Sequence, residues 1–129
     1  MTAVNDNEKP TEISLTASYV TFGGNTGNGE YFYAFDKNTL LFTKPGNYTI
    51  SITLSKSTPK HFEIYSFICS NDTGNITRDE SITSLPNNIT LKNNNSSNQS
   101  INLSIVMYDT VEEKYFSCDP QVLNSPDPD

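Results

Sequence analysis

The chain has 129 residues, a formal net charge of −7 and a hydrophobic fraction of 34%. This length favours one domain, and 7 Tyr and 7 Phe supply enough apolar volume for a modest core, which argues against a disordered chain. With only 8 Lys and Arg residues together, the chain is a poor candidate for a nucleic-acid binder, because holding a phosphate backbone needs clustered cations.

Membrane association is not expected either. No apolar stretch reaches the ~20 residues that a membrane-spanning helix needs. The polar start, residues 1–7, has no signal-peptide core, which favours a cytoplasmic location and leaves secretion open.

The first half of the chain has the pattern of short strands separated by turns. Gly, Pro, Asn and Asp interrupt β-branched and aromatic segments whose apolar period is near two. We expect residues 1–10 to be a flexible N-terminal segment. The expected strands are Ile13–Phe22, Tyr31–Phe35, Leu40–Thr43 and Asn47–Leu54. In the last of these, Tyr48, Ile50, Ile52 and Leu54 share one face, as in a half-buried strand.

The second half continues this pattern. The expected strands are His61–Cys69, Ile89–Lys92, Ile101–Tyr108 and Lys114–Cys118, the last returning beside its predecessor as a hairpin. Phe62, Ile64 and Ile68 share one parity, as do Ile101, Leu103, Ile105 and Met107. Residues 71–86 and 93–100 are polar and are expected to be loops, and residues 124–129 a flexible C-terminal tail.

Together these segments predict an all-β fold. Strands recurring at roughly 8–12-residue spacing, without a helical stripe, are typical of a sandwich or barrel. We predict a single-domain immunoglobulin-like β-sandwich of about seven short antiparallel strands, formed by residues 11–123.

Residues able to bind metals or form a cysteine nucleophile are few. Cys69 and Cys118 each end a predicted strand and are either free, buried thiols or a disulfide across the sandwich. Their separation from His61, the one histidine, matches no zinc-ligand spacing and supplies no adjacent Cys–His pair. Asp72, Asp79 and Glu80 form no calcium-binding loop motif and are better explained as surface charge. We therefore predict no metal and no cofactor.

One dipeptide carries latent chemistry, Asp119-Pro120 after the last predicted strand. Its amide is tertiary, so the nitrogen is a comparatively good proton acceptor. The aspartate can attack its own carbonyl through a five-membered ring, and a nearby acid could protonate the departing proline nitrogen. Asp-Pro is also an ordinary way to end a strand, so a structural role remains the alternative. A second Asp-Pro, Asp127-Pro128, serves as an internal control in the tail.

The segment from Ser117 to Pro126, Ser-Cys-Asp-Pro-Gln-Val-Leu-Asn-Ser-Pro, resembles the ending of the small bacterial DP-EP family. Members of that family are small β-domains regarded as aspartic-type self-processing proteins that cleave at the Asp-Pro bond. The resemblance implies that Asp119 and Pro120 form a scissile site and that the C-terminal segment is the chain's own substrate.

A proton donor for such a cleavage would come from elsewhere in the fold. Asp36 is the first candidate, because the aromatic strand that precedes it could keep its carboxyl protonated. Tyr33 could orient that carboxyl. The alternative readings are a solvated turn carboxylate for Asp36 and a half-buried strand aromatic for Tyr33.

The second functional hypothesis is a module without catalysis. Small β-domains bind partners, including further copies of themselves, through exposed strand edges or loops. The two hypotheses are compatible, since removal of a C-terminal strand would expose an edge.

Overall fold

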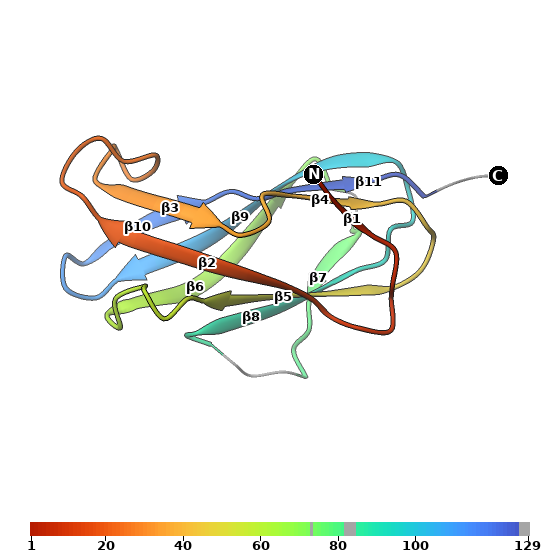
Figure 1. The fold of residues 1–129 in the computed structure, drawn as a ribbon, viewed down its shortest axis with the longest axis horizontal. Helices are drawn as coiled ribbons and strands as arrows, with labels where there is room; N and C mark the ends of the chain where they lie inside the picture. Colours follow the sequence, from red (N-terminus) through yellow and green to blue (C-terminus); the bar gives the residue numbers. More distant parts are fainter. Residues whose placement is uncertain (73, 82–84, 127–129) are drawn as a thin grey trace.

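The computed structural model describes residues 1–72, 74–81 and 85–126. Within these residues the chain forms strands and turns and no helix, and the strands build two sheets (Figure 1). No helix in the described part of the chain is therefore long and apolar enough to cross a membrane.

The two sheets contain six and five strands. The six-stranded sheet consists of β1 (Thr2–Val4), β4 (Thr39–Phe42), β6 (Phe62–Ser70), β9 (Gln99–Asp109), β10 (Lys114–Cys118) and β11 (Gln121–Asn124). The five-stranded sheet consists of β2 (Thr11–Tyr19), β3 (Tyr31–Phe35), β5 (Tyr48–Leu54), β7 (Ile76–Arg78) and β8 (Asn88–Asn93).

Strand β9 organises the six-stranded sheet. It pairs with β6 along one edge and with β10 and then β11 along the other, while β11 also pairs with β4 and β4 with β1. The five-stranded sheet has the order β3-β2-β5-β8-β7.

The expectation of purely antiparallel pairing is wrong for three pairs. Strands β1 and β4, β4 and β11, and β2 and β5 run parallel. The reason is the connectivity, because β3 and β4 belong to different sheets and the chain returns on the far side of β2 as β5. A parallel pair needs such a crossover, which short strands and turn signals in a sequence do not reveal.

One hydrophobic cluster fills the space between the sheets, which pack face to face as a sandwich. The ring of Tyr31, from the five-stranded sheet, stacks on Phe116 of the other sheet at a centroid distance of 4.1 Å and meets Phe62 edge-on at 5.8 Å. The all-β prediction is confirmed, and the strands β3 and β10 have the predicted bounds. The inward positions Tyr48, Ile50 and Ile52 are buried as predicted, as are the four expected side chains of β9.

The predicted parity of strand β6 is wrong beyond Ile64. A β-bulge between Ile64 and Ser66 places Tyr65 as an extra residue opposite the regular ladder of β9. One extra residue exchanges the two faces of a strand, so Phe67 packs against the core while Ile68 is 60% exposed.

The bulge can be tested by comparing two isoleucines on the same strand. We expect Ile64→Ala to lower the free energy of unfolding by about 3 kcal/mol, because Ile64 is buried. Ile68→Ala should change it by no more than ~0.5 kcal/mol. Urea denaturation of both variants measures this difference, and equal losses would contradict the assigned register.

Two strands, β1 and β7, lie in segments expected to be flexible or looped, and β11 was not predicted as a strand. Residues 1–10 contain β1, whose Val4 is buried, and β7 lies within residues 71–86. The predicted tail begins inside β11 at Asn124, and Asp127-Pro128 lies outside the described residues.

The Asn-rich segment 93–100 is more ordered than its composition predicted. Asn93 and Asn124 are buried and exchange two amide hydrogen bonds, of 2.7 and 2.9 Å. Asn95 is also buried, with a positive φ of 45°, and donates to the carbonyl oxygens of Phe42 and Lys44. The amides of Asn93 and Asn124 satisfy one another and can therefore be buried at little cost, which a composition argument overlooks.

Candidate functional site

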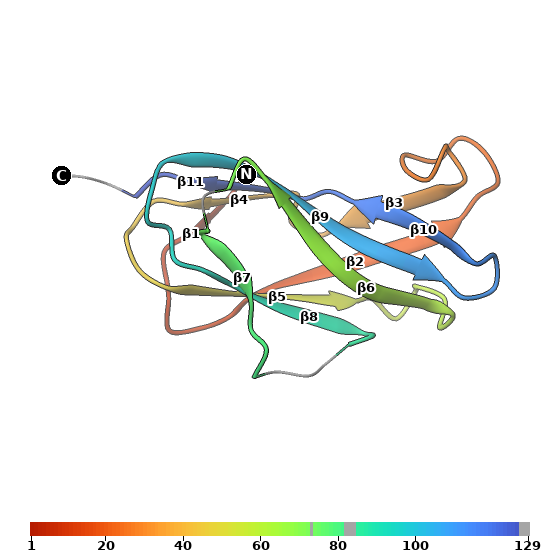
Figure 2. The same ribbon diagram turned by 180° about the vertical axis from the view of Figure 1, so that it is seen from behind.

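Strands β10 and β11 lie end to end along the same edge of β9, and we call this pair the β10–β11 lane. The Asp119–Pro120 bond lies between its two strands. Cys118 faces Ile105 of β9. Gln121, three residues after Cys118, faces Asn102, three residues before Ile105. The register against β9 is therefore the same on both sides of the bond. Figure 2 shows β10 and β11 following one another beside β9.

Pro120 explains why the hydrogen-bond ladder with β9 is interrupted without a shift in register. Pro120 has no N–H to donate, so the pairing stops and resumes at Gln121. The outer neighbour of the lane changes at the same place. Before the bond, the Thr26 hydroxyl donates to the carbonyl oxygen of Ser117 at 2.5 Å, and after it the Gln121 N–H donates to the carbonyl oxygen of Asn38 at 2.8 Å.

The two residues of the bond point to opposite sides of the sheet. Pro120 is buried, whereas Asp119 is exposed and shares the outer face with Ser117 and Gln121. Among the described contacts, the Asp119 carboxylate has no hydrogen-bond or ion-pair partner. The described non-glycine residues with positive φ lie elsewhere, so neither residue of the bond has the left-handed conformation.

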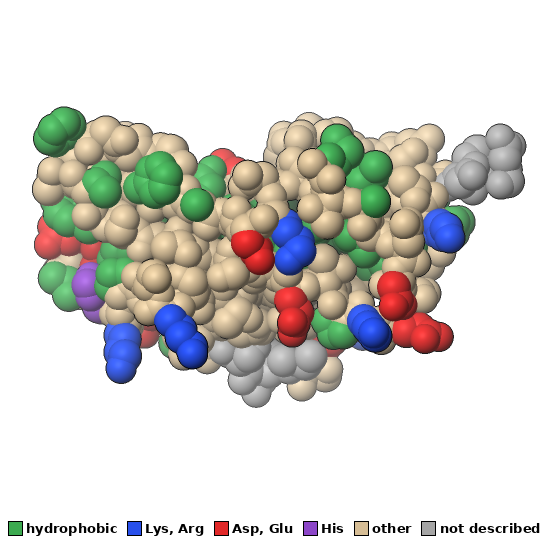
Figure 3. All heavy atoms as spheres, viewed as in Figure 1, with side chains coloured by type: hydrophobic (Ala, Val, Ile, Leu, Met, Phe, Trp, Pro, Cys, Tyr) green, Lys and Arg blue, Asp and Glu red, His purple; other side chains and the backbone are tan. Residues whose placement is uncertain are grey.

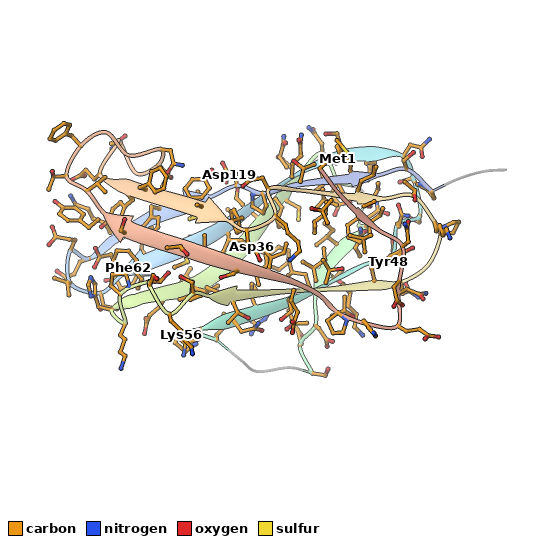
Figure 4. The ribbon with its side chains drawn as sticks, viewed as in Figure 1. Met1, Asp36, Tyr48, Lys56, Phe62 and Asp119 are labelled. Atoms are coloured by element: carbon orange, nitrogen blue, oxygen red, sulfur yellow. The ribbon has the colours of Figure 1, made fainter. Side chains whose placement is uncertain are left out.

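Asp36, the predicted proton donor, lies in the connection between β3 and β4, two residues before the Asn38 carbonyl that accepts from Gln121. Figure 4 shows Asp36 and Asp119 in the same central part of the molecule. The Asp36 carboxylate accepts the N–H of Ser14 at 2.8 Å and pairs with Lys37 at 3.4 Å. Its side chain is 49% exposed, in solvent rather than among aromatic rings.

Tyr33 does not contact the Asp36 carboxylate in the described structure. Its backbone exchanges two hydrogen bonds with the Asn25 side chain, and its ring meets Phe35 edge-on at 5.8 Å. It is half-buried and packs against the core. Asp36 thus lies in the connection whose Asn38 carbonyl oxygen accepts from Gln121, and Tyr33 has the packing role of a strand aromatic.

The two cysteines are free thiols rather than a disulfide. They lie on either side of β9, with Cys69 on β6 and Cys118 on β10. Burial, reinforced by Asp72, raises the pKa of the Cys69 thiol to about 11, and burial followed by the charge of Asp119 raises the pKa of Cys118. Both are therefore protonated at neutral pH and are poor nucleophiles.

The outer face of the six-stranded sheet carries a group of aromatic side chains that the sequence did not reveal. Tyr65 of β6, Tyr108 of β9 and Tyr115 of β10 form what we call the tyrosine cluster. The ring of Tyr115 lies 5.0 Å from that of Tyr65 and 4.6 Å from that of Tyr108. Tyr65 and Tyr115 are 59% and 55% exposed. Tyr65 points outward by alternation from the buried Ile64, and the bulge leaves it without a partner in the ladder of β9, a feature common near functional surfaces.

The same face continues from the tyrosine cluster to Asp119. Across β6, β9 and the β10–β11 lane, the outward side chains beyond the cluster are mostly small and polar, namely Ser66, Ser70, Asn102, Ser104, Ser117 and Gln121. Val106, Ile68 and Leu123 are the apolar members. This face is the one nearest the viewer in Figure 2, whereas Figure 3 looks onto the opposite side of the molecule, where acidic and basic side chains are interspersed.

A buried carboxylate, Asp109, ends strand β9. The Tyr31 hydroxyl donates to it at 2.7 Å, the N–H groups of Val111 and Glu112 donate at 2.9 and 3.1 Å, and His61 Nε2 lies 3.6 Å away. Burial acts to raise the pKa of Asp109, but these hydrogen bonds and the charge of His61 outweigh it and lower the pKa. Asp109 thus ties the two sheets to the turn after β9, a structural role that explains its burial.

The described hollows of the surface do not contain the Asp119–Pro120 bond. One, of about 540 Å³, is lined by residues of the 54–60 segment together with Phe62, Pro86 and Asn87. Asp36 lines another, of about 360 Å³, together with Glu12, Ser14 and Thr53. The described residues include no group of three His, Cys, Asp or Glu side chains suited to holding a metal ion.

No protein-family model matches the chain, and no curated protein matches it. The resemblance of residues 117–126 to the DP-EP family therefore rests on those residues alone.

Proposed function

We propose that this protein is a non-enzymatic binding module that recognises its partner on the outer face of the six-stranded sheet. The tyrosine cluster carries the proposal. Large exposed aromatic groups that gather on one face, rather than being scattered singly, are typical of interaction sites. Tyrosine suits such a surface because it combines a rigid apolar ring with a hydroxyl at low conformational cost.

The geometry of the Asp119–Pro120 bond gives less support to catalysis. The Asp119 side chain stands out from the sheet into solvent, whereas a strand carbonyl lies in the plane of the ladder. The candidate acid, Asp36, already accepts a backbone N–H and pairs with Lys37. Such a carboxylate is a poor proton donor for the departing nitrogen.

We infer further that the two-sheet fold is immunoglobulin-like in the broad sense of a face-to-face β-sandwich. The shared core and the β9–β10 hairpin support this assignment. The parallel pairs and the eleven strands of the described chain depart from the predicted seven antiparallel strands.

The binding surface can be located by NMR. We expect a ligand to shift the resonances of Tyr65, Tyr108 and Tyr115 first, in a screen of neutral oligosaccharides, basic peptides, acidic peptides and nucleotides. Shifts that map to the loops or to a sheet edge, or a screen in which no compound perturbs these tyrosines, would contradict the proposed function.

Self-cleavage at Asp119–Pro120 is the second candidate, supported by the firm hold of β9 on both sides of the bond. We expect the purified protein to keep its full mass over several days at mildly acidic and at neutral pH, because Asp119 points away from the sheet. Intact-mass spectrometry measures this. Loss of residues 120–129 that is abolished both by Asp119→Asn and by unfolding would instead establish self-cleavage, whereas cleavage that survives unfolding would be ordinary acid lability.

A further inference from the structure

The outer face of the six-stranded sheet has the chemistry of a carbohydrate site, and we propose that its ligand is a neutral oligosaccharide. This inference rests on the proposed function and names the ligand class. The ligand would lie along the β10–β11 lane, from the tyrosine cluster toward Gln121. The distance from Tyr115 to Gln121 along the lane is roughly 20 Å at about 3.3 Å per residue, which accommodates a short chain of sugar units.

The tyrosine rings supply the apolar part of such a site. A sugar ring presents polarised C–H groups on its faces, and these are attracted to the negative face of an aromatic ring. The rings of Tyr65 and Tyr108 are inclined to that of Tyr115 by 70° and 41°. The three rings are not coplanar, so they form a contoured surface. Such a surface suits a single soluble oligosaccharide chain better than the flat surface of a crystalline polysaccharide.

The polar side chains beyond the cluster supply the directional part. Ser104, Ser117 and Asn102 offer neutral donors and acceptors at neighbouring outward positions. The backbone groups of β9 are engaged laterally with β6 and with the β10–β11 lane. A ligand on this face must therefore bring its own hydrogen-bonding groups, which sugar hydroxyls do and an extended peptide main chain does only at a sheet edge.

The charges of the face exclude anionic ligands. At the outward positions of β6, β9 and the β10–β11 lane, within the described residues, the charged side chains are Glu63 and Asp119, with no Lys or Arg. Carboxylates repel phosphate and sulfate groups and accept hydrogen bonds from sugar hydroxyls. Asp119, exposed and without a described partner, is placed to do this at the far end of the face.

Calorimetric titration of the full chain tests the ligand class. The probes are four neutral tetrasaccharides, built from β-1,4-glucose, β-1,4-xylose, β-1,4-mannose and α-1,4-glucose, with tetralysine and a sulfated tetrasaccharide for comparison. We expect at least one neutral probe to bind with an affinity that does not depend on salt, and the sulfated probe not to bind. Failure of all four neutral probes at about 10 mM would overturn the inference.

Variants connect the binding to the face. Tyr115→Ala should weaken the affinity by about tenfold or more, and Asp119→Asn more modestly, since a hydroxyl acceptor remains. Phe32→Ala is the matched control, because Phe32 is a 48% exposed strand aromatic of the five-stranded sheet. Circular dichroism and melting temperature verify folding of each variant. An equal loss in Phe32→Ala and Tyr115→Ala would overturn the site.

The failure of this inference is distinguishable from failure of the proposed function. Salt-sensitive binding of tetralysine that requires Tyr115, without binding of the neutral sugars, would overturn the ligand class and retain a binding module on this face. If no ligand class shifts the resonances of the tyrosine cluster, the proposed binding module itself is contradicted.

Discussion

Asp109→Ala is expected to lower the free energy of unfolding by about 4 kcal/mol, because it leaves three buried or half-buried donors without their acceptor. The Tyr31 hydroxyl and the N–H groups of Val111 and Glu112 all donate to this carboxylate. A loss of this size is a large part of the ~5–15 kcal/mol by which a typical domain is stable. Urea denaturation followed by tyrosine fluorescence measures the effect.

Tyr31→Phe is the matched control for this prediction. It removes one hydroxyl and keeps the stacked contact with Phe116, so the loss should be smaller, about 1–2 kcal/mol. An Asp109→Ala variant as stable as the parent would contradict the assigned role of Asp109.

The contribution of Asp109 to the free energy of unfolding depends on pH in a defined direction. The pKa of Asp109 is lowered in the folded protein from its ordinary value of 3.8. Its contribution to stability is therefore complete above the ordinary pKa and is lost as the pH falls through the lowered one. Asp109→Asn should flatten the acid side of the stability profile, and an unchanged acid profile would contradict the lowered pKa.

A chain that ends at Asp119 is expected to lose cooperative folding. Such a chain lacks β11, which lies between β4 and β9 rather than at the rim of the sheet. Val122 is fully buried, worth about 1.5–3 kcal/mol, and Asn93 would lose its amide partner Asn124, worth about 1–3 kcal/mol. Strands β4 and β1 would also lose their connection to β9.

Comparison with a chain that ends at Pro126 isolates the effect of β11. Dispersion of the amide resonances and a urea transition should be retained in the longer chain and lost in the shorter one. Addition of a synthetic peptide of residues 120–126 to the shorter chain should restore part of the dispersion. Equal transition midpoints for the two chains would show that β11 is dispensable.

This position of β11 changes what self-cleavage would mean. The sequence alone suggests the release of a short tail, or at most the exposure of an edge. In the fold, a cut between Asp119 and Pro120 would sever the strand that links two parts of one sheet. The product would stay folded only while the severed strand remained bound.

The sequence predicted well where local pattern and burial agree. Strands β5 and β9 alternate with a period of two because one face of each is buried, and both appear as expected. The bulge in β6 could not be predicted from the sequence. Whether Ile68 faces the core or the solvent depends on one extra residue opposite β9, which only the strand pairing reveals. Strand β11 escaped detection because its short sequence is ordered by pairing with β9 and with Thr39–Phe42, which lies far away in the chain.

For the candidate site, local chemistry singled out the Asp119-Pro120 dipeptide but could not give its surroundings. Residues 36–38 meet the bond only through a crossover between sheets, and the tyrosine cluster joins three strands. Tyr65, Tyr108 and Tyr115 each follow an alternating pattern in which core and surface aromatics look alike. A sequence signal for the cluster exists only once the strand order is known.

The location of β11 also bears on aggregation. Because β11 lies between β4 and β9, the edges of those two strands that face it are unpaired whenever β11 is detached. A molecule in that state exposes two hydrogen-bonding templates that the folded molecule conceals, and further chains could pair with them.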